Sequence, residues 1–120
     1  MTTVLVIDDS PSEMAKFRDM LSKSNYQVLE ATNGEQGCQM AVAHLPDVIL
    51  MDVVMPEMNG FQATRKITRD KATAHIPIIM ISTKNQETDR VWGKRQGAKE
   101  YLTKPIDESG LVQIIRKVME

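Results

Sequence analysis

The sequence predicts an α/β fold: a doubly wound, five-stranded parallel sheet whose strands alternate with five helices. Two observations support this prediction. Five short apolar segments alternate along the chain with segments of helical periodicity, as expected for successive right-handed βαβ units. Three of these apolar segments are uninterrupted runs, which are typical of strands buried on both faces of a sheet.

The first strand is expected over residues 4–7, which form an apolar run that ends at two aspartates. A helix follows, with Ser10 suited to the N-cap and Pro11 to the first helical position. Glu13 stands three residues after Ser10 and is expected to complete a capping box. The helix is expected to end near residues 24–25.

The next strand is expected over residues 27–31, and its more polar composition suits a place nearer the edge of the sheet. A second helix begins around Asn33 and continues to about Ala43, and Pro46 ends it. The run over residues 48–51 is fully apolar, which predicts a central strand.

A third helix is expected after the turn at Asn59-Gly60, followed by a polar loop over residues 70–75 and an apolar strand over 77–81. The inner stripe of this helix is modest. It consists of Phe61, Thr64 and Ile67.

The fourth helix is expected over residues 86–96, with Gly97 as its C-cap. Only Val91 and Trp92 offer apolar anchors, so this helix is expected to be weakly held. Three basic residues are expected to face outward as candidates for partner contact: Arg90, Lys94 and Arg95.

The last strand is expected over residues 100–103, and Asp107 is expected to cap the final helix. This helix has the clearest amphipathic stripe of the chain. The stripe consists of Leu111, Ile114, Ile115 and Val118.

Composition sets further bounds. The 120 residues fit one domain, 1–120. The 15 basic and 16 acidic side chains nearly cancel, so we expect neither nucleic acid nor a membrane as a partner. Cys38 is the only cysteine, which excludes an internal disulfide and a cysteine-based zinc cluster. The sequence contains no signal peptide and no run of transmembrane length, so we expect a cytoplasmic protein.

Polar residues stand where four of the five predicted strands end. Asp8 and Asp9 follow the first strand, Asp52 follows the central strand, Ser82 ends the fourth and Lys104 follows the fifth. Each has an ordinary explanation by itself, as a turn residue, a helix cap or a solvated lysine. Because the strands of a parallel sheet end at one edge, we expect these five side chains to form a single site.

The chemistry of such a site is specific. Clustered carboxylates favour a hard cation, and Mg²⁺ is the natural candidate. A carboxylate beside this ion can attack phosphorus, while an ammonium and a hydroxyl stabilise the phosphoryl oxygens in transfer. The set therefore predicts phosphoryl transfer to Asp52.

At these residues the chain resembles the receiver domains of bacterial response regulators, and is similar to single-domain chemotaxis regulators of the CheY type. The resemblance covers the whole chain. It is carried by Asp8-Asp9, the segment 52–60, Ser82 and Lys104-Pro105. It implies a flavodoxin-like (βα)5 fold with strand order 2-1-3-4-5.

The resemblance also implies residue roles. Asp52 would accept a phosphoryl group from a histidine kinase of the chemotaxis type. Mg²⁺ would be held by the side chains of Asp9 and Asp52 and by the backbone carbonyl of Val54, with Asp8 helping through water. Lys104 would bridge to the phosphoryl oxygens. The chain would not be an enzyme apart from catalysing its own phosphorylation and dephosphorylation.

The resemblance further implies a switch, in which Ser82 moves toward the phosphoryl group and Tyr101 swings inward behind it. The Lys104-Pro105 bond is often cis in this family. A monomer is expected, with a downstream protein target that contacts the fourth helix, the fifth strand and the last helix. The segment 87–98 resembles PilH-type regulators of type IV pilus twitching motility.

Three alternatives remain open at this point. A Mg²⁺-dependent phosphohydrolase with an aspartate nucleophile usually has a second aspartate two residues later, where this chain has Val54. A flavodoxin-like cofactor carrier needs a phosphate-cradling loop after the first strand, where Asp8 and Asp9 would repel phosphate. A phosphate sink, which drains a kinase without driving an effector, is a further possibility within the family.

Overall fold

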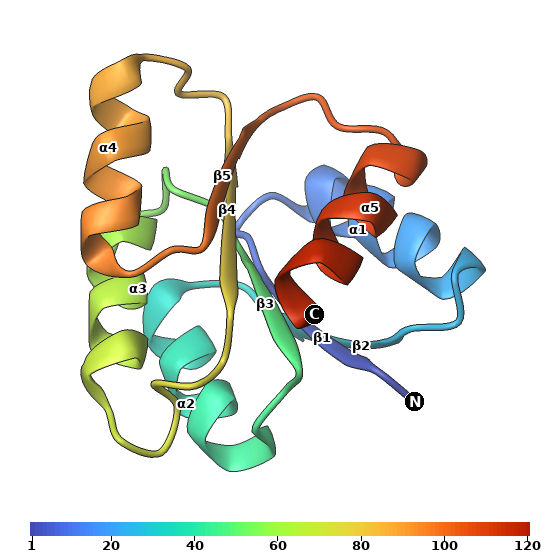
Figure 1. Cartoon of the computed structure of the whole chain (residues 1–120), viewed down its shortest axis with the longest axis horizontal. Coiled ribbons are helices and arrows are strands. Elements are labelled where there is room, and N and C mark those ends of the chain that lie inside the picture. Colours follow the sequence, from blue (N-terminus) through green and yellow to red (C-terminus); the bar gives the residue numbers. More distant parts are fainter.

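The computed structural model describes residues 1–120 and alternates strictly between strand and helix (Figure 1). None of the helices combines the length and the apolar character needed to cross a membrane. The elements are β1 (Thr3–Ile7), α1 (Pro11–Lys23), β2 (Gln27–Ala31), α2 (Gly34–His44), β3 (Val48–Met51), α3 (Gly60–Arg69), β4 (Ile78–Ser82), α4 (Glu87–Gln96), β5 (Glu100–Thr103) and α5 (Glu108–Met119).

The five strands form one parallel sheet in the order β2-β1-β3-β4-β5. The predicted fold class and strand order are therefore confirmed. The register pairs Ile7 with Met51 and Met51 with Met80, so the last residues of β1 and β3 lie side by side. Because all strands run the same way, whatever follows them in the sequence emerges at one edge.

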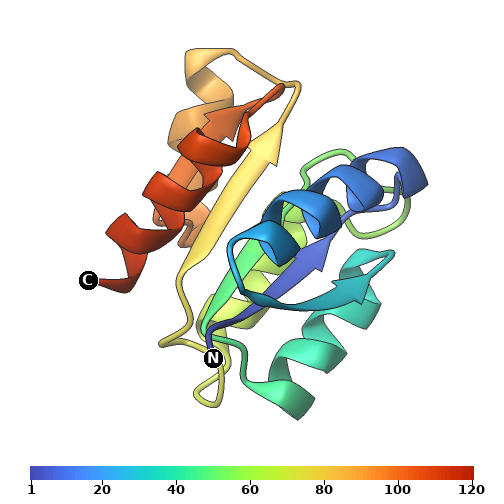
Figure 2. The same ribbon diagram turned by 90° about the vertical axis from the view of Figure 1, so that its right-hand side faces the viewer.

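Alternate residues of each strand face two separate cores. On one face, Leu5 and Ile7 of β1 belong to the cluster that α2, α3 and α4 cover. On the other face, Val4 and Val6 pack beneath α1 and α5. Figures 1 and 2 show these two helical layers on opposite sides of the sheet. Strands covered on both faces must be apolar throughout, which explains the uninterrupted runs in the sequence.

The prediction of a capping box at the start of α1 is wrong. The Ser10 side chain does cap the helix, since its Oγ accepts the backbone N–H of Glu13 at 3.3 Å. The reciprocal bond is missing because the Ser10 N–H donates to Asp8 Oδ1 at 2.9 Å instead. The Glu13 carboxylate is thereby left to turn toward the end of β5. A complete capping box does form at α3, between Asn59 and Gln62.

The fourth helix departs from prediction in one respect. Its expected anchors, Val91 and Trp92, are 42% and 47% exposed, so α4 is weakly held as predicted. Lys94 and Arg95 are exposed, as expected. Arg90 does not face outward: its guanidinium is half-buried and reaches across to β5. The Tyr101 carbonyl and the Thr103 hydroxyl of β5 accept hydrogen bonds from this cation, and a helical pattern alone does not reveal them.

Leu45 offers a test of backbone strain. It ends α2 in the left-handed conformation, with φ 46° and ψ 61°, and its side chain is 51% exposed. A Cβ disfavours this conformation, and little packing would be lost with the side chain. We expect Leu45→Gly to raise the free energy of unfolding by about 0.5–1 kcal/mol, measured by urea denaturation. Leu45→Ala is the control, because it keeps the Cβ. Equal stability of the two variants would contradict the strain argument.

Candidate functional site

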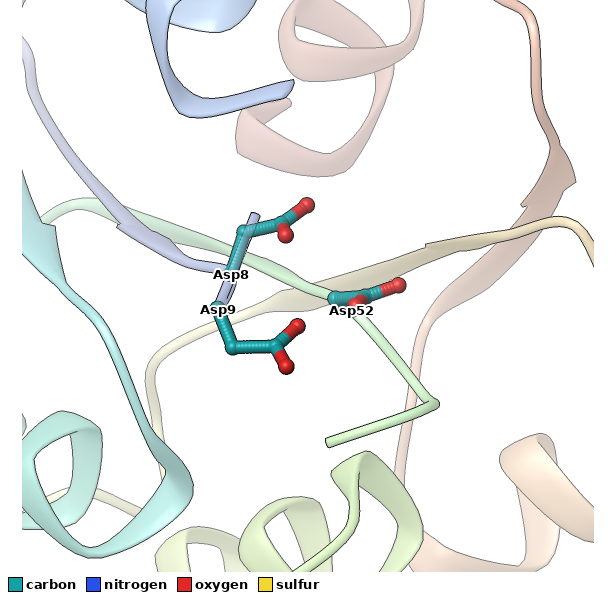
Figure 3. A group of neighbouring side chains, drawn as sticks. All are labelled: Asp8, Asp9 and Asp52. Atoms are coloured by element: carbon teal, nitrogen blue, oxygen red, sulfur yellow. The ribbon is translucent and has the colours of Figure 1, made fainter. Parts of the chain in front are cut away.

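Three aspartates meet at the edge of the sheet where the strands end. Asp8 and Asp9 follow β1 and Asp52 follows β3, and one carboxylate oxygen from each lies within 4.8 Å of the other two (Figure 3). The neighbouring strands enforce this proximity, since the Asp52 N–H donates to the Ile7 carbonyl at 2.9 Å. Asp8 is buried, Asp52 is half-buried and Asp9 is exposed. The predicted convergence of these three residues is present in the structure.

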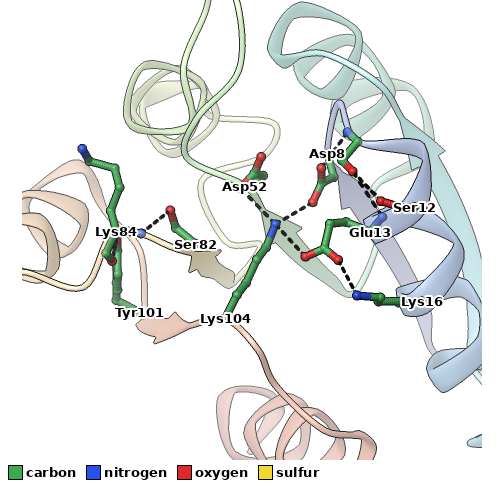
Figure 4. A network of polar contacts seen from close by, with 10 residues as sticks. Asp8, Ser12, Glu13, Lys16, Asp52, Ser82, Lys84, Tyr101 and Lys104 are labelled. Carbon is green, nitrogen blue, oxygen red and sulfur yellow. Dashed lines mark hydrogen bonds and ion pairs between the residues drawn. The ribbon is translucent and has the colours of Figure 1, made fainter.

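Lys104 follows the edge strand β5 and completes the cluster at the same end of the sheet. Its Nζ lies 3.1 Å from Asp8 Oδ2 and 3.3 Å from Asp52 Oδ1 (Figure 4). The backbone N–H of Lys104 donates to the Ser82 carbonyl at 2.8 Å, which holds the Lys104 backbone beside the end of β4. The lysine side chain is only 10% exposed. The Lys104-Pro105 peptide bond is cis.

Glu13 is a site residue that the sequence pattern did not reveal. Its Oε1 lies 3.3 Å from Lys104 Nζ, and its Oε2 lies 3.3 Å from Lys16 Nζ. Burial acts to raise the pKa of Glu13, but the two ammonium groups outweigh it and hold this pKa below its ordinary value. A glutamate three residues after an N-cap has an ordinary capping explanation, so no signal in the sequence pointed to Lys104.

Ser82 and Tyr101 lie on the α4 side of the site, and both are buried. The Ser82 Oγ accepts the backbone N–H of Lys84 at 3.1 Å, and the Tyr101 hydroxyl donates to the Lys84 carbonyl at 2.8 Å (Figure 4). Neither side chain bonds to Asp52. The structure therefore joins the two predicted switch residues through one loop residue, Lys84.

The loop after Asp52 folds back tightly on β3. The Gly60 N–H donates to the Val53 carbonyl at 2.8 Å. A Cβ at position 60 would lie 2.8 Å from the Cα of Val53 and would clash with the carbonyl oxygen of Asp52. Glycine is therefore required for this approach. Val54 lies within the loop with its side chain exposed.

The electrostatics of the cluster are unbalanced. Burial, and next the charge of Asp8, raise the pKa of Asp52 to about 6 despite the nearby ammonium. Burial acts to lower the pKa of Lys104, but the carboxylates of Asp52, Asp8 and Glu13 outweigh it and raise that pKa above its ordinary value. Lys104 is therefore a firm cation. It does not neutralise all the carboxylates that surround it.

This donor set fits a hard divalent cation. Asp8, Asp9 and Asp52 offer only oxygen ligands, and their mutual repulsion favours an added positive charge. No histidine or cysteine belongs to the cluster, which agrees with Mg²⁺ rather than a softer metal.

Comparison with known proteins identifies the family. Residues 4–116 match the family model described as the response regulator receiver domain. The chain belongs to this family. Receiver domains bind Mg²⁺ in an acidic pocket and interact with histidine kinases, and the aspartate cluster lies where such a pocket is expected. Membership favours a phosphorelay regulator over the flavodoxin-like carrier and the phosphohydrolase.

Three relatives of this receiver domain are informative. Protein PilH of Pseudomonas aeruginosa is 56% identical over 119 residues, which cover 99% of this chain and 98% of PilH. The structure of Vibrio cholerae chemotaxis protein CheY4 superimposes with a TM-score of 0.93 at 30% identity, covering 98% of both chains. The receiver domain of a Pseudomonas aeruginosa sensor histidine kinase, solved with a magnesium ion coordinated in its active-site cleft, gives a TM-score of 0.92 at 28% identity, covering 98% and 97% of the two chains.

The raised pKa of Asp52 predicts how the stability of the receiver domain depends on pH. The folded state holds the Asp52 proton more tightly than the unfolded chain does, so this stabilisation is complete below pH 4 and is lost as the pH rises through about 6. Asp52→Asn should therefore raise the free energy of unfolding at pH 7.5 in EDTA by about 1–3 kcal/mol. The gain should shrink toward pH 4, where the wild-type carboxyl is protonated. Urea denaturation across this range measures it.

Asp19→Asn is the matched control, because Asp19 is exposed on α1 and has only a surface pair with Lys23. It should change stability by less than about 0.5 kcal/mol at every pH. Added Mg²⁺ should stabilise the wild type more than Asp52→Asn. A pH-independent difference between wild type and Asp52→Asn would show that charge at Asp52 is not the cause.

Proposed function

We propose that Asp52 accepts a phosphoryl group from a histidine kinase of the chemotaxis type in a Mg²⁺-dependent reaction, and that residues 1–120 act as one receiver domain that signals by a conformational switch. The observation that carries this proposal is the position of the Lys104 ammonium, 3.1 Å from Asp8 and 3.3 Å from Asp52, beside three clustered carboxylates. A cation so placed can stabilise negative charge that arrives at Asp52.

In the transfer itself, a carboxylate oxygen of Asp52 attacks the phosphorus of the kinase phosphohistidine. The phosphorus–nitrogen bond breaks as the new phosphorus–oxygen bond forms, and the imidazole leaves. Lys104 neutralises charge on the phosphoryl oxygens. Ser82, at the end of β4, turns its hydroxyl to donate a hydrogen bond to the product acyl phosphate. Before phosphorylation, Glu13 contacts the same ammonium at 3.3 Å.

The residues that would hold Mg²⁺ are Asp9 and Asp52 through their side chains and Val54 through its backbone carbonyl, with Asp8 acting through water. The ion supplies Lewis-acid charge neutralisation when bound. The Asp8 carboxylate also orients Lys104, whose ammonium donates to Oδ2, and accepts the backbone N–H of Ser10 at Oδ1.

The signal would pass from Ser82 and Tyr101 to a protein target at the surface of α4, β5 and α5. α4 is suited to this task because few of its side chains are buried, and weakly anchored elements move most readily. We propose that the chain acts as a monomer, with neither nucleic acid nor a membrane as its target.

We further propose that this receiver domain works in a chemotaxis-like system that controls type IV pilus twitching motility, in the cytoplasm. The support is the 56% identity with PilH over nearly the full length of both chains, together with the resemblance of the segment 87–98 to PilH-type regulators.

Phosphoryl uptake tests the first proposal. Labelled phosphoryl groups from a phosphorylated chemotaxis-type kinase should appear on the wild type at up to one per chain with Mg²⁺. Uptake should fall at least 100-fold in EDTA and in Asp52→Asn, because the cation or the nucleophile is missing. Asp19→Asn is the control and should label like the wild type. Full labelling of Asp52→Asn would overturn the site assignment.

Motility tests the second proposal. In the bacterium that carries this gene, a chromosomal Asp52→Asn substitution should change the diameter of the twitching zone as deletion of the gene does, because both remove phosphorylation-dependent signalling. Flagellar swimming should be unaffected. Asp19→Asn should behave as wild type. Normal twitching in both the deletion and Asp52→Asn strains would refute the assignment to this pathway. It would not affect the proposal that Asp52 accepts a phosphoryl group.

A further inference from the structure

Arg90 ties α4 to β5 at the position of Tyr101. Its Nη1 donates to the Tyr101 carbonyl at 3.1 Å, and its Nη2 donates to Thr103 Oγ1 at 2.9 Å. The guanidinium carbon also lies 5.7 Å from the centre of the Tyr101 ring, within the range of a cation–π contact. A single side chain therefore contacts both the backbone and the ring of Tyr101.

Gly93, one turn further along α4, makes room for the same ring. A Cβ at this position would lie 2.9 Å from Tyr101 Cδ2 and 2.8 Å from Met80 Sδ. Glycine weakens the interior of a helix, and α4 is already poorly anchored. The helix thus gives up local stability at a position where the tyrosine ring packs closely against its backbone.

The far end of the ring reaches the loop after β4. The Tyr101 hydroxyl donates to the Lys84 carbonyl at 2.8 Å, and the Lys84 N–H donates to Ser82 Oγ at 3.1 Å. Tyr101 is 3% exposed and Ser82 is fully buried. The ring therefore connects α4 to the loop that follows Ser82, and none of these contacts involves Asp52.

We propose that Arg90 is a positioning residue of the switch: together with Gly93 it makes α4 a receptor for the Tyr101 ring and holds that ring inward. This inference rests on the proposed phosphorylation of Asp52. Holding the ring inward biases the chain toward the conformation that the phosphoryl group favours, so less binding energy is needed to complete the switch.

The consequence for affinity is quantitative. A ligand that binds only the inward conformation shows an apparent Kd equal to its intrinsic Kd divided by the inward fraction. If loss of Arg90 lowers that fraction several-fold, the apparent affinity for a phosphoryl mimic falls by the same factor. If the guanidinium merely joined α4 to β5, its loss would lower the free energy of unfolding but leave the apparent Kd for the mimic unchanged.

The first experiment measures the exposure of Tyr101 in the absence of Mg²⁺ and any phosphoryl mimic, by hydroxyl-radical labelling read with mass spectrometry. Tyr26, the other tyrosine, serves as an internal reference. We expect Tyr101 to label 3- to 10-fold faster in Arg90→Ala than in the wild type, and at an intermediate rate in Arg90→Lys, which keeps the charge but not the two-pronged geometry.

Two further variants sharpen this readout. Gly93→Ala leaves the guanidinium intact and improves the helix, yet it should expel the ring and expose Tyr101 to a similar extent. Arg65→Ala is the matched control, because Arg65 is an exposed arginine of α3 without an ion pair. Unchanged protection of Tyr101 in Arg90→Ala or in Gly93→Ala, with the variant folded, would overturn the proposal.

The second experiment titrates beryllofluoride with Mg²⁺ and follows backbone amide signals around Ser82. Arg90→Ala and Gly93→Ala should raise the apparent Kd 3- to 10-fold, and Arg65→Ala should match the wild type. An unchanged Kd despite an exposed Tyr101 would refute the coupling to Asp52. Failure of the wild type to bind beryllofluoride would instead overturn the proposed function, while the labelling experiment would still decide the role of Arg90.

Discussion

The site depends on one buried ammonium among carboxylates. Lys104 contacts Asp8, Glu13 and Asp52 at once, and without it these groups would repel one another in a partly dehydrated setting. One cation cannot balance three carboxylates, and burial together with the charge of Asp8 still raises the pKa of Asp52. The unbalanced charge suits the cluster both to a divalent ion and to a reaction that converts the Asp52 carboxylate into an acyl phosphate.

The parallel sheet, buried on both faces, explains why the charged residues cluster at one edge. Parallel strands buried on both faces leave no room for polar groups along their length, so functional side chains gather where the strands end. The adjacent register of β1 and β3 brings Asp8 and Asp52 together, while β5 delivers Lys104 from beyond β4. Gly60 then lets the loop between β3 and α3 fold back on Asp52. The reactive groups therefore lie at the rim of a sheet that is buried on both faces.

Local rules are broken on the α4 side. Gly93 lies inside a helix, Val91 and Trp92 are exposed, and Arg90 is half-buried. Departures of this kind concentrate at functional positions. They converge here on Tyr101, whose ring spans the distance from α4 to the loop beyond Ser82.

The sequence by itself determined the ten elements, the burial of the central strands and the residues at the strand ends, because apolar runs, caps and turn residues act over a few neighbouring positions. The strand order came from family resemblance, since spacing along the chain does not encode it. Only the tertiary structure decided that Glu13 turns to Lys104 and that Arg90 turns to Tyr101. Glu13 had a possible local partner at the helix N-cap, and Arg90 could have faced solvent. Each instead contacts a group far away in the sequence, because the Lys104 ammonium and the Tyr101 carbonyl come near only when the sheet is assembled.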